Sequence, residues 1–282
     1  MSSVKVVIGI EDVRSAIREA RSQGLTIGYV PTMGALHAGH ASLIRAARAE
    51  TGFVVVSIFV NPTQFGPTED LGRYPRAFEA DERLCAAERT DLIFAPTAAE
   101  MYPSGFRTSV AVTGLQDALC GASRPGHFQG VATVVLKLFN IVTPDFAYFG
   151  QKDAQQARIL QQMVRDLNLP INLRICPIVR EEDGLALSSR NRYLSPTQRR
   201  QAVVLYQALQ DARTAIDSGE QDGEIIRQNL VKRVTRTPGA VLDYAAVVDA
   251  DCLQPVTRIQ GTILIALAVR FGETRLIDNI LI

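Results

Sequence analysis

Continuous apolar runs alternate with helix-like segments over roughly the first 180 residues, and this alternation constrains the fold more than any other feature of the chain. Runs that are apolar at nearly every position are typical of strands buried on both faces, because helices then cover the sheet on each side. The sequence therefore predicts an α/β fold with a Rossmann-like, doubly wound parallel sheet. The strands are predicted at residues 25–30, 53–60, 91–95, 146–149 and 171–176, and the helices at residues 41–49, 77–89, 130–142 and 154–167.

The pattern changes near residue 185. Ser195-Pro-Thr-Gln198 has the features of a helix start, because Ser195 and Gln198 can form a capping box and proline fits the first helical position. We predict two domains, residues 1–184 with the parallel sheet and residues 185–282 as a smaller α+β domain with antiparallel strands. In the second domain the helices are predicted at residues 195–218 and 223–235, and the strands at residues 241–248, 261–271 and 274–281.

Composition excludes several classes of protein. Lys and Arg number 30 against 29 Asp and Glu, so the net charge of +1 provides no overall basic field for nucleic acid. No apolar run approaches the ~18 residues that a membrane helix needs, and the N-terminus lacks the apolar stretch and cleavage site of a signal peptide. The four cysteines are dispersed without a C-x-x-C pair, which favours a reducing compartment. We therefore expect a cytoplasmic protein with no nucleic-acid or membrane partner.

The segment Pro31-Thr-Met-Gly-Ala-Leu-His-Ala-Gly-His40 connects the first predicted strand to the next helix. His37 and His40 are three residues apart, so both rings lie on one face of the first helical turn. A helix start offers free backbone N–H groups and the positive end of the dipole, which together form an anion site. Gly39 lets a flat group approach the backbone. This combination suits a triphosphate with its nucleoside packed close by.

Two other interpretations of these histidines remain open. The rings could simply cap the helix or satisfy local carbonyl groups. They could also bind zinc with the chain's third histidine, His127, because three neutral imidazoles can hold that metal with one open position. We favour nucleotide binding over the cap, and the cap over zinc.

The polar loop of residues 61–76 follows the second predicted strand and contains Asn61 and Gln64. Their amides donate and accept hydrogen bonds without charge, which suits the hydroxyl and carboxylate groups of a small polar substrate. A turn built by Asn61, its following proline and Gly66 is an equally good interpretation of the same residues.

Gly150-Gln-Lys-Asp153 joins another strand to a helix. Lys152 near the helix start is placed to meet phosphate as a mobile point charge, and Gln156 lies one turn further along the same face. A solvated lysine on a polar turn is the alternative. Ligands bind at the carboxyl ends of parallel strands. We therefore expect this segment, Asn61 and residues 31–40 to converge at one edge of the sheet.

Leu187-Ser-Ser-Arg-Asn191 lies at the predicted domain boundary. Two hydroxyls and a guanidinium in succession make a compact phosphate clamp, although a Ser-rich turn is the plainer interpretation. Its position favours a loop that closes over a ligand. The chain shows no Ser/His/Asp order, no His-Glu-x-x-His and no carboxylate cluster that resembles a dedicated metal cage. A Mg²⁺ ion carried by ATP needs few protein ligands, so its ligands stay unassigned.

Several of these segments also resemble known signatures. His37-x-Gly-His40 resembles the signature of class I aminoacyl-tRNA synthetases and their nucleotidylyltransferase relatives, and Ser188-Ser-Arg190 resembles their second, mobile motif with Arg190 in the place of lysine. Over nearly its whole length the chain is similar to the pantothenate synthetase (pantoate–β-alanine ligase) family. Leu187, where the family commonly has Met, and Ala154, where it often has Tyr, depart from the pattern without removing a polar group. The similar segments occur in order at residues 31–40, 57–65, 74–76, 127–130, 149–153 and 187–194.

The resemblance implies an amide-forming ligase that condenses (R)-pantoate with β-alanine. ATP would activate the pantoate carboxylate as pantoyl adenylate, so that the products are pantothenate, AMP and pyrophosphate. It further implies Mg²⁺ with ATP, a homodimer, and a C-terminal domain that closes over the active site. Rival hypotheses are a nucleotidylyltransferase of the same superfamily acting on another acceptor, a three-histidine zinc hydrolase, and a non-catalytic nucleotide-binding module.

The resemblance also implies roles for individual residues. Gln64 and Gln156 would bind pantoate, and Gln64 would also lie beside β-alanine. His37 would be the acid of the reaction. The expected catalytic residues are His37, His40, Lys152 and Arg190. The expected ATP-binding residues are Met33, Gly34, Ala35, Leu36, His37, Ala38, Gly39, His40, Gly150, Gln151, Lys152, Asp153, Val179, Leu187, Ser188, Ser189 and Arg190.

Overall fold

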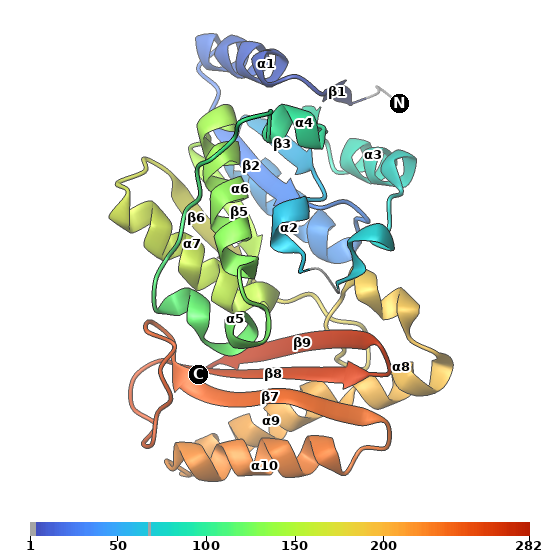
Figure 1. The fold of residues 1–282 in the computed structure, drawn as a ribbon, viewed down its shortest axis with the longest axis vertical. Helices are drawn as coiled ribbons and strands as arrows, with labels where there is room; N and C mark the ends of the chain where they lie inside the picture. Colours follow the sequence, from blue (N-terminus) through green and yellow to red (C-terminus); the bar gives the residue numbers. More distant parts are fainter. Residues whose placement is uncertain (1–3, 67–68) are drawn as a thin grey trace.

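A computed structural model describes residues 4–66 and 69–282 (Figure 1). A six-stranded sheet forms its first part, with strand order β1-β4-β3-β2-β5-β6 and parallel pairing throughout. The predicted parallel α/β fold is therefore confirmed. Residues 1–3 of the predicted first domain and residues 67–68 of the predicted loop lie outside the described residues. The strands are β1 (Lys5–Val7), β2 (Ile27–Thr32), β3 (Phe53–Ile58), β4 (Leu92–Phe94), β5 (Phe146–Gly150) and β6 (Asn172–Cys176).

Helices cover both faces of this sheet, as the doubly wound prediction requires. Tyr29 of β2 belongs to a hydrophobic cluster with three helices on one face, whereas its neighbour Val30 packs with two helices on the other. Because successive strand residues point to opposite faces, a strand that is apolar at every position contributes side chains to the hydrophobic cores on both faces. The first face carries α1 (Ile10–Ser22), α6 (His127–Val142) and α7 (Ala154–Asp166), and the second carries α2 (Ala38–Glu50) and α3 (Phe78–Ala87).

Several predicted boundaries were wrong by a few residues, and four elements were not predicted: β1, α1, α4 (Ala98–Met101) and α5 (Leu119–Ser123). The first predicted strand begins and ends two residues later in the structure, because Pro31 and Thr32 still pair with β3. Strand β1 and helix α1 precede it without having been predicted. β1 has three residues and lies at the sheet edge, where its Val6 is exposed, so it presents no apolar run long enough to detect.

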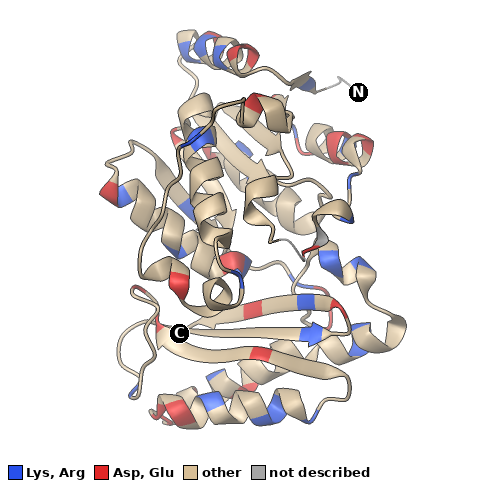
Figure 2. Cartoon of the chain, in the orientation of Figure 1, with Lys and Arg blue, Asp and Glu red and all other residues tan. Residues whose placement is uncertain are grey.

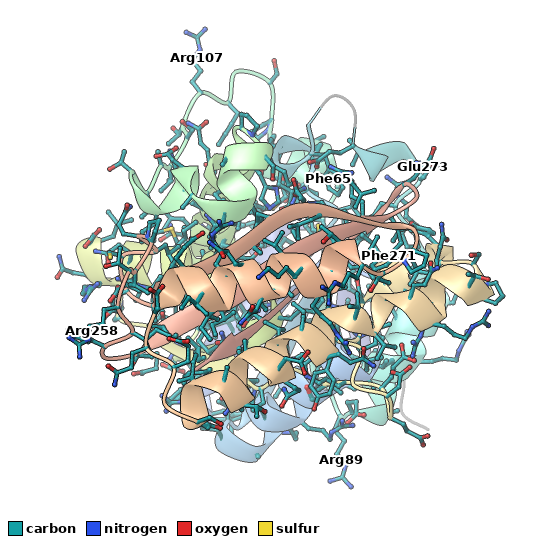
Figure 3. The ribbon with its side chains drawn as sticks, turned by 90° about the horizontal axis from the view of Figure 1, so that it is seen from below. Phe65, Arg89, Arg107, Arg258, Phe271 and Glu273 are labelled. Atoms are coloured by element: carbon teal, nitrogen blue, oxygen red, sulfur yellow. The ribbon has the colours of Figure 1, made fainter. Side chains whose placement is uncertain are left out.

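The C-terminal part contains an antiparallel sheet of β7 (Ala240–Asp249), β8 (Ile263–Phe271) and β9 (Thr274–Leu281), as predicted. Seen from below, α9 (Val204–Asp217) and α10 (Gly223–Thr235) lie across its outer face (Figure 3). The predicted helix at 195–218 is divided into α8 (Pro196–Ala202) and α9. Val203 between them has φ −61° and ψ −18°, closer to 3₁₀ than to α geometry.

Strand β8 joins the two parts of the molecule. Ile263 and Ile265 pack with α9 and α10, whereas Leu264 and Ala266 belong to the large cluster of the parallel-sheet domain. The C-terminal sheet is therefore sandwiched between its own helices and the first domain. The division at residues 184 and 185 stays a prediction.

In the view of Figure 2, Lys and Arg are interspersed with Asp and Glu over both parts of the molecule. Helix α6 carries one charged side chain, Lys137, in accordance with its burial between the sheet and its neighbours. Within residues 4–66 and 69–282, no helix is both long and apolar enough to span a membrane.

Candidate active site

The segments predicted to converge follow β2, β3 and β5, which are neighbours in the sheet. Because these strands are parallel, the chain leaves all three at the same edge. The C-terminal sheet covers this edge (Figure 1), and β9 contacts the turn Gln151–Asp153 after β5. A site built here is therefore bounded by both parts of the chain.

His37 and His40 cap helix α2, so the capping interpretation describes a real feature of the chain. His37 is the N-cap residue, and its Nδ1 accepts from the backbone N–H of Gly39 at 3.1 Å. The Nδ1 of His40 accepts from the backbone N–H of His37 at 3.3 Å. Both Nδ1 atoms are therefore unprotonated, and each neutral ring carries its proton on Nε2. Capping thus fixes the tautomer and leaves one N–H donor per ring for a ligand.

Both rings are neutral at physiological pH. Burial, together with the charge of Lys152, lowers the pKa of His37 to about 4. Burial, His37 and Lys152 lower the pKa of His40 to about 3. The ring centroids are 4.2 Å apart, so two imidazolium ions side by side would repel each other.

A buried carboxylate that the sequence interpretation missed holds the loop before these histidines. Asp81 of α3 accepts from the backbone N–H of Ala35 at 2.9 Å and from that of Leu36 at 2.7 Å. Gly34 and Ala35 adopt positive φ of 82° and 51°, a conformation that glycine tolerates better than alanine. A carboxylate with two N–H donors offsets the strain of that turn. Only its burial, which raises the pKa of Asp81, distinguishes it from the other acidic residues of the helix.

Gln64 faces the same loop. Its Nε2 lies 2.8 Å from the Sδ of Met33, and its Oε1 accepts from the Asn61 amide at 3.1 Å. Asn61 is buried, caps the 3₁₀ turn Pro62–Gln64 and accepts from Tyr102 Oη at 2.8 Å. Asn61 therefore builds the turn, in agreement with the turn interpretation, and the turn presents Gln64 toward Met33 of the loop before His37.

His127 uses both ring nitrogens within the protein. Its Nδ1 lies 2.7 Å from the carbonyl oxygen of Gln64, and its Nε2 lies 3.0 Å from Nη1 of Arg124. Arg124 in turn makes a bidentate pair with Glu69, at 2.6 Å for each contact. Burial and Arg124 lower the pKa of His127 to about 4. No group of three potential ligands for a metal occurs in the described part of the chain, so the zinc hypothesis gains no support.

A cavity of about 810 Å³ lies between the two parts of the molecule, within the usual range for small-molecule sites. Of the residues predicted for the site it is lined by Lys152, Asp153, Gln156, Ser188 and Arg190. His37 and His40 do not line the cavity. Lys152 does line it, and its positive charge lowers the pKa of both histidines. The predicted residues outside its lining are Met33, Gly34, Ala35, Leu36, His37, Ala38, Gly39, His40, Gln64, Gly150, Gln151, Val179, Leu187 and Ser189.

The predicted clamp at the domain boundary is held by its own backbone. The N–H of Leu187 donates to the carbonyl of Val179 at 3.0 Å, which pairs two of the predicted ATP-binding residues. Ser188 Oγ accepts from the N–H of Arg190 at 3.2 Å and so starts the 3₁₀ helix Ser189–Tyr193. The Ser-rich turn and the clamp are therefore compatible descriptions of the same segment.

The part of the cavity lining next to Lys152 was not predicted. It comes from β9, whose Asp278 and Asn279 are buried and line the cavity. The signal in the sequence is an adjacent polar pair inside an otherwise apolar strand, but the partners of that pair become visible only in the fold.

The whole chain has close relatives. The family model described as Pantoate-beta-alanine ligase matches residues 5–281. The chain is 53% identical over 279 residues to the pantothenate synthetase of Acetivibrio thermocellus, with 99% of each chain covered. It is 56% identical over 273 residues to that of Moorella thermoacetica, which covers 97% of this chain and 96% of the relative.

Solved structures agree with these relatives. The crystal structure of pantothenate synthetase from Thermus thermophilus superposes with a TM-score of 0.93 at 46% identity and covers 98% of this chain and 99% of that one. Pantoate-beta-alanine ligase from Francisella tularensis, solved with β-γ ATP and β-alanine, gives a TM-score of 0.80 at 36% identity over 99% and 98% of the two chains. These matches bear out the ligase interpretation over its rivals: the chain belongs to the pantoate–β-alanine ligase family, whose members are AMP-forming ligases that join pantoate to β-alanine with ATP.

Proposed function

We propose that the site carries out the ligation in two steps through an enzyme-bound pantoyl adenylate. A pantoate carboxylate oxygen attacks the α-phosphorus of ATP, and the bond to the β-phosphate breaks, so that pyrophosphate leaves. The β-alanine amine then attacks the acyl carbon; AMP leaves with the bonding electrons, and the amine loses a proton. The observation that carries this proposal is the pair of neutral imidazoles at the start of α2, next to Lys152.

This arrangement matches what the first step needs. The pantoate carboxylate is already ionised, so no general base is required, and the task is to stabilise charge on the α-phosphate. The Nε2–H groups of His37 and His40 are oriented by their caps and need no reorganisation. Lys152 and Arg190 add positive charge on the phosphates, and Ser188 and Ser189 add hydroxyl donors. For His37 to act as an acid, the charge of the bound nucleotide must raise its pKa from about 4.

Small-substrate binding is assigned to two glutamines. Gln64 lies beside Met33 of the nucleotide loop, and Gln156 lines the cavity one helical turn after Lys152. Neutral amides suit the hydroxyls of pantoate, and we assign Gln64 a contact with β-alanine as well. The Francisella relative, solved with an ATP analogue and β-alanine, supports a site that accepts both substrates.

The remaining partners follow from the family and from ATP chemistry. Mg²⁺ enters as part of MgATP, and Asp153 on the cavity wall offers a carboxylate oxygen of the type that this ion accepts. We propose a homodimer on the resemblance alone. A cytoplasmic location is supported by the ATP requirement and by four widely spaced cysteines.

Oxygen transfer tests the adenylate directly. Pantoate labelled with ¹⁸O in its carboxylate should pass one labelled oxygen to AMP in each turnover, because the carboxylate oxygen becomes a phosphate oxygen. Mass spectrometry of the AMP measures it. Label in inorganic phosphate together with ADP would indicate an acyl phosphate instead and would reject the proposal.

A further inference from the structure

The turn that carries Lys152 is held by a side chain from the far end of the sequence. Asn279 of β9 donates through Nδ2 to the carbonyl oxygen of Gln151 at 3.0 Å and to that of Lys152 at 2.9 Å. Its Oδ1 accepts from Nε2 of Gln151 at 3.0 Å. Both N–H hydrogens of the carboxamide and one of the two lone pairs on its oxygen therefore bond to Gln151 and Lys152.

These bonds lie out of water. Asn279 is 3% exposed, so each of its bonds would leave an unsatisfied buried group if it were broken. The carbonyls of Gln151 and Lys152 belong to the 3₁₀ turn that connects β5 to α7. A side chain that binds both carbonyls fixes the orientation of this turn and therefore the direction in which Lys152 leaves the backbone.

The neighbouring residue holds the second phosphate-binding segment. Asp278 accepts from Nη1 and Nη2 of Arg180 at 2.6 and 2.9 Å, and Arg180 also donates to the carbonyl of Gly184 at 3.0 Å. Arg180 directly follows Val179, the residue paired with Leu187 at the base of the clamp. Two adjacent side chains of β9 thus bind two of the three segments that are assigned to ATP.

We infer that Asn279 is a positioning residue for the reaction: its carboxamide sets the place of Lys152, so that the last strand of the chain completes the phosphate site. The inference rests on the proposed role of Lys152. Asn279 does not touch substrate in this account and acts only through the lysine. The C-terminal sheet then does more than cover the cavity, because adenylation depends on one of its side chains.

A double-mutant cycle tests this dependence, with pantoate-dependent ATP–pyrophosphate exchange as the readout. Asn279→Ala should lower the exchange rate by about 10-fold to 100-fold, the scale for a catalytic group displaced by about 1 Å. In a Lys152→Ala background the same change should cost less than about 3-fold, because the group it positions is already absent. An equal loss in both backgrounds, or no loss in the wild-type background, would overturn the inference.

Further variants separate positioning from folding. Asn279→Asp keeps the size of the side chain but sets an oxygen against two carbonyls, so it should lose as much activity as the alanine variant; a normal rate would contradict the inference. Ile280→Ala, the matched control, removes a buried side chain from the same strand and should lower the melting temperature while leaving exchange within about 2-fold. Should Ile280→Ala lose exchange as severely as Asn279→Ala, the effect belongs to the strand and the inference fails.

The single Lys152→Ala variant tests the proposed function separately. A normal exchange rate in that variant would contradict both the role of Lys152 and the inference built on it. A large loss combined with additive behaviour in the cycle would leave the proposed function standing and reject only the positioning role of Asn279.

Discussion

At the scale of single residues, capping and catalysis are compatible uses of the same two imidazoles. The bonds that satisfy backbone N–H groups at the start of α2 use Nδ1 of each ring and leave Nε2–H available. A ligand that accepts from Nε2 therefore does not compete with the cap. A histidine that caps a helix next to Lys152 can therefore donate a hydrogen bond to a phosphate oxygen without any change in backbone structure.

Replacing His40 by Ala should lower the adenylation rate by about 10²-fold to 10³-fold, the usual scale for the loss of one preorganised donor. His40→Asn is the matched variant, since its amide can still accept from the N–H of His37 while no longer reaching the phosphate. Rapid-quench measurement of pyrophosphate formation reports the rate. A near-normal rate in His40→Ala would reduce the rings to helix caps.

The three histidines should also make stability depend on pH. Folding lowers their pKa values from the usual 6.5 to about 4, 3 and 4 for His37, His40 and His127. The unfolded chain then binds more protons than the folded one, so stability is complete above about pH 6.5 and is lost as the pH falls below it. The expected slope is about 1.4 kcal/mol per pH unit for each histidine within this window.

Urea unfolding at pH 7, 6 and 5 measures that slope in the wild type and in His127→Gln. The variant should be less stable at pH 7, because its bonds to Gln64 and Arg124 are changed. As the pH falls, its free energy of unfolding should decrease less steeply than that of the wild type, by the equivalent of about one proton taken up on unfolding. Identical slopes in the two proteins would mean that His127 is not held neutral by the fold.

At the scale of elements, the core strands and most helices could be predicted because each one carries its own signal. The inner strands of the parallel sheet are apolar on both faces, and the helices between them have regular apolar spacing. Strand β1 gave no such signal, because an edge strand of three residues buries only one of them. Helix boundaries shifted at α8 and α9 because a local 3₁₀ geometry at Val203 leaves no trace in composition.

The sequence indicates only the local parts of the proposed site. His37, Lys152 and Ser188 each follow a strand or begin a helix, so neighbouring residues along the chain reveal them. Asp81 and Asn279 act on backbone groups of segments that are 46 and 127 residues away. Contacts of this kind depend on how α3 and β9 pack, and no short motif contains both partners.

Asp81 of α3 is predicted to stabilise the loop before His37. Asp81→Ala leaves the buried N–H groups of Ala35 and Leu36 without an acceptor and should cost about 1–3 kcal/mol of stability for each. Asp81→Asn keeps one acceptor oxygen and should lose about half as much. Chemical denaturation gives the stabilities, and the KM for ATP should rise in the same order because the loop before His37 is released. A stable Asp81→Ala variant with an unchanged KM would show that the loop holds itself.

At the scale of the whole molecule, the cavity exists only because the two parts of the chain meet. Its lining includes the turn after β5 at the carboxyl edge of the parallel sheet, and residues of β9. The apolar contact through Leu264 and Ala266 holds the parts together, and Asp278 and Asn279 join β9 to Arg180 and to the turn of Lys152. The two sheets therefore form one unit around the cavity, and we propose that adenylation in this unit needs no amine.

The central claim is that this unit forms a bound acyl adenylate reversibly. Labelled pyrophosphate should therefore enter ATP when pantoate and Mg²⁺ are present and β-alanine is absent, and adding β-alanine should convert the intermediate to pantothenate and AMP. Omission of pantoate provides the control and should abolish the exchange. Stoichiometric ADP with no pantoate-dependent exchange would contradict the adenylate mechanism and the role assigned to His37, His40 and Lys152.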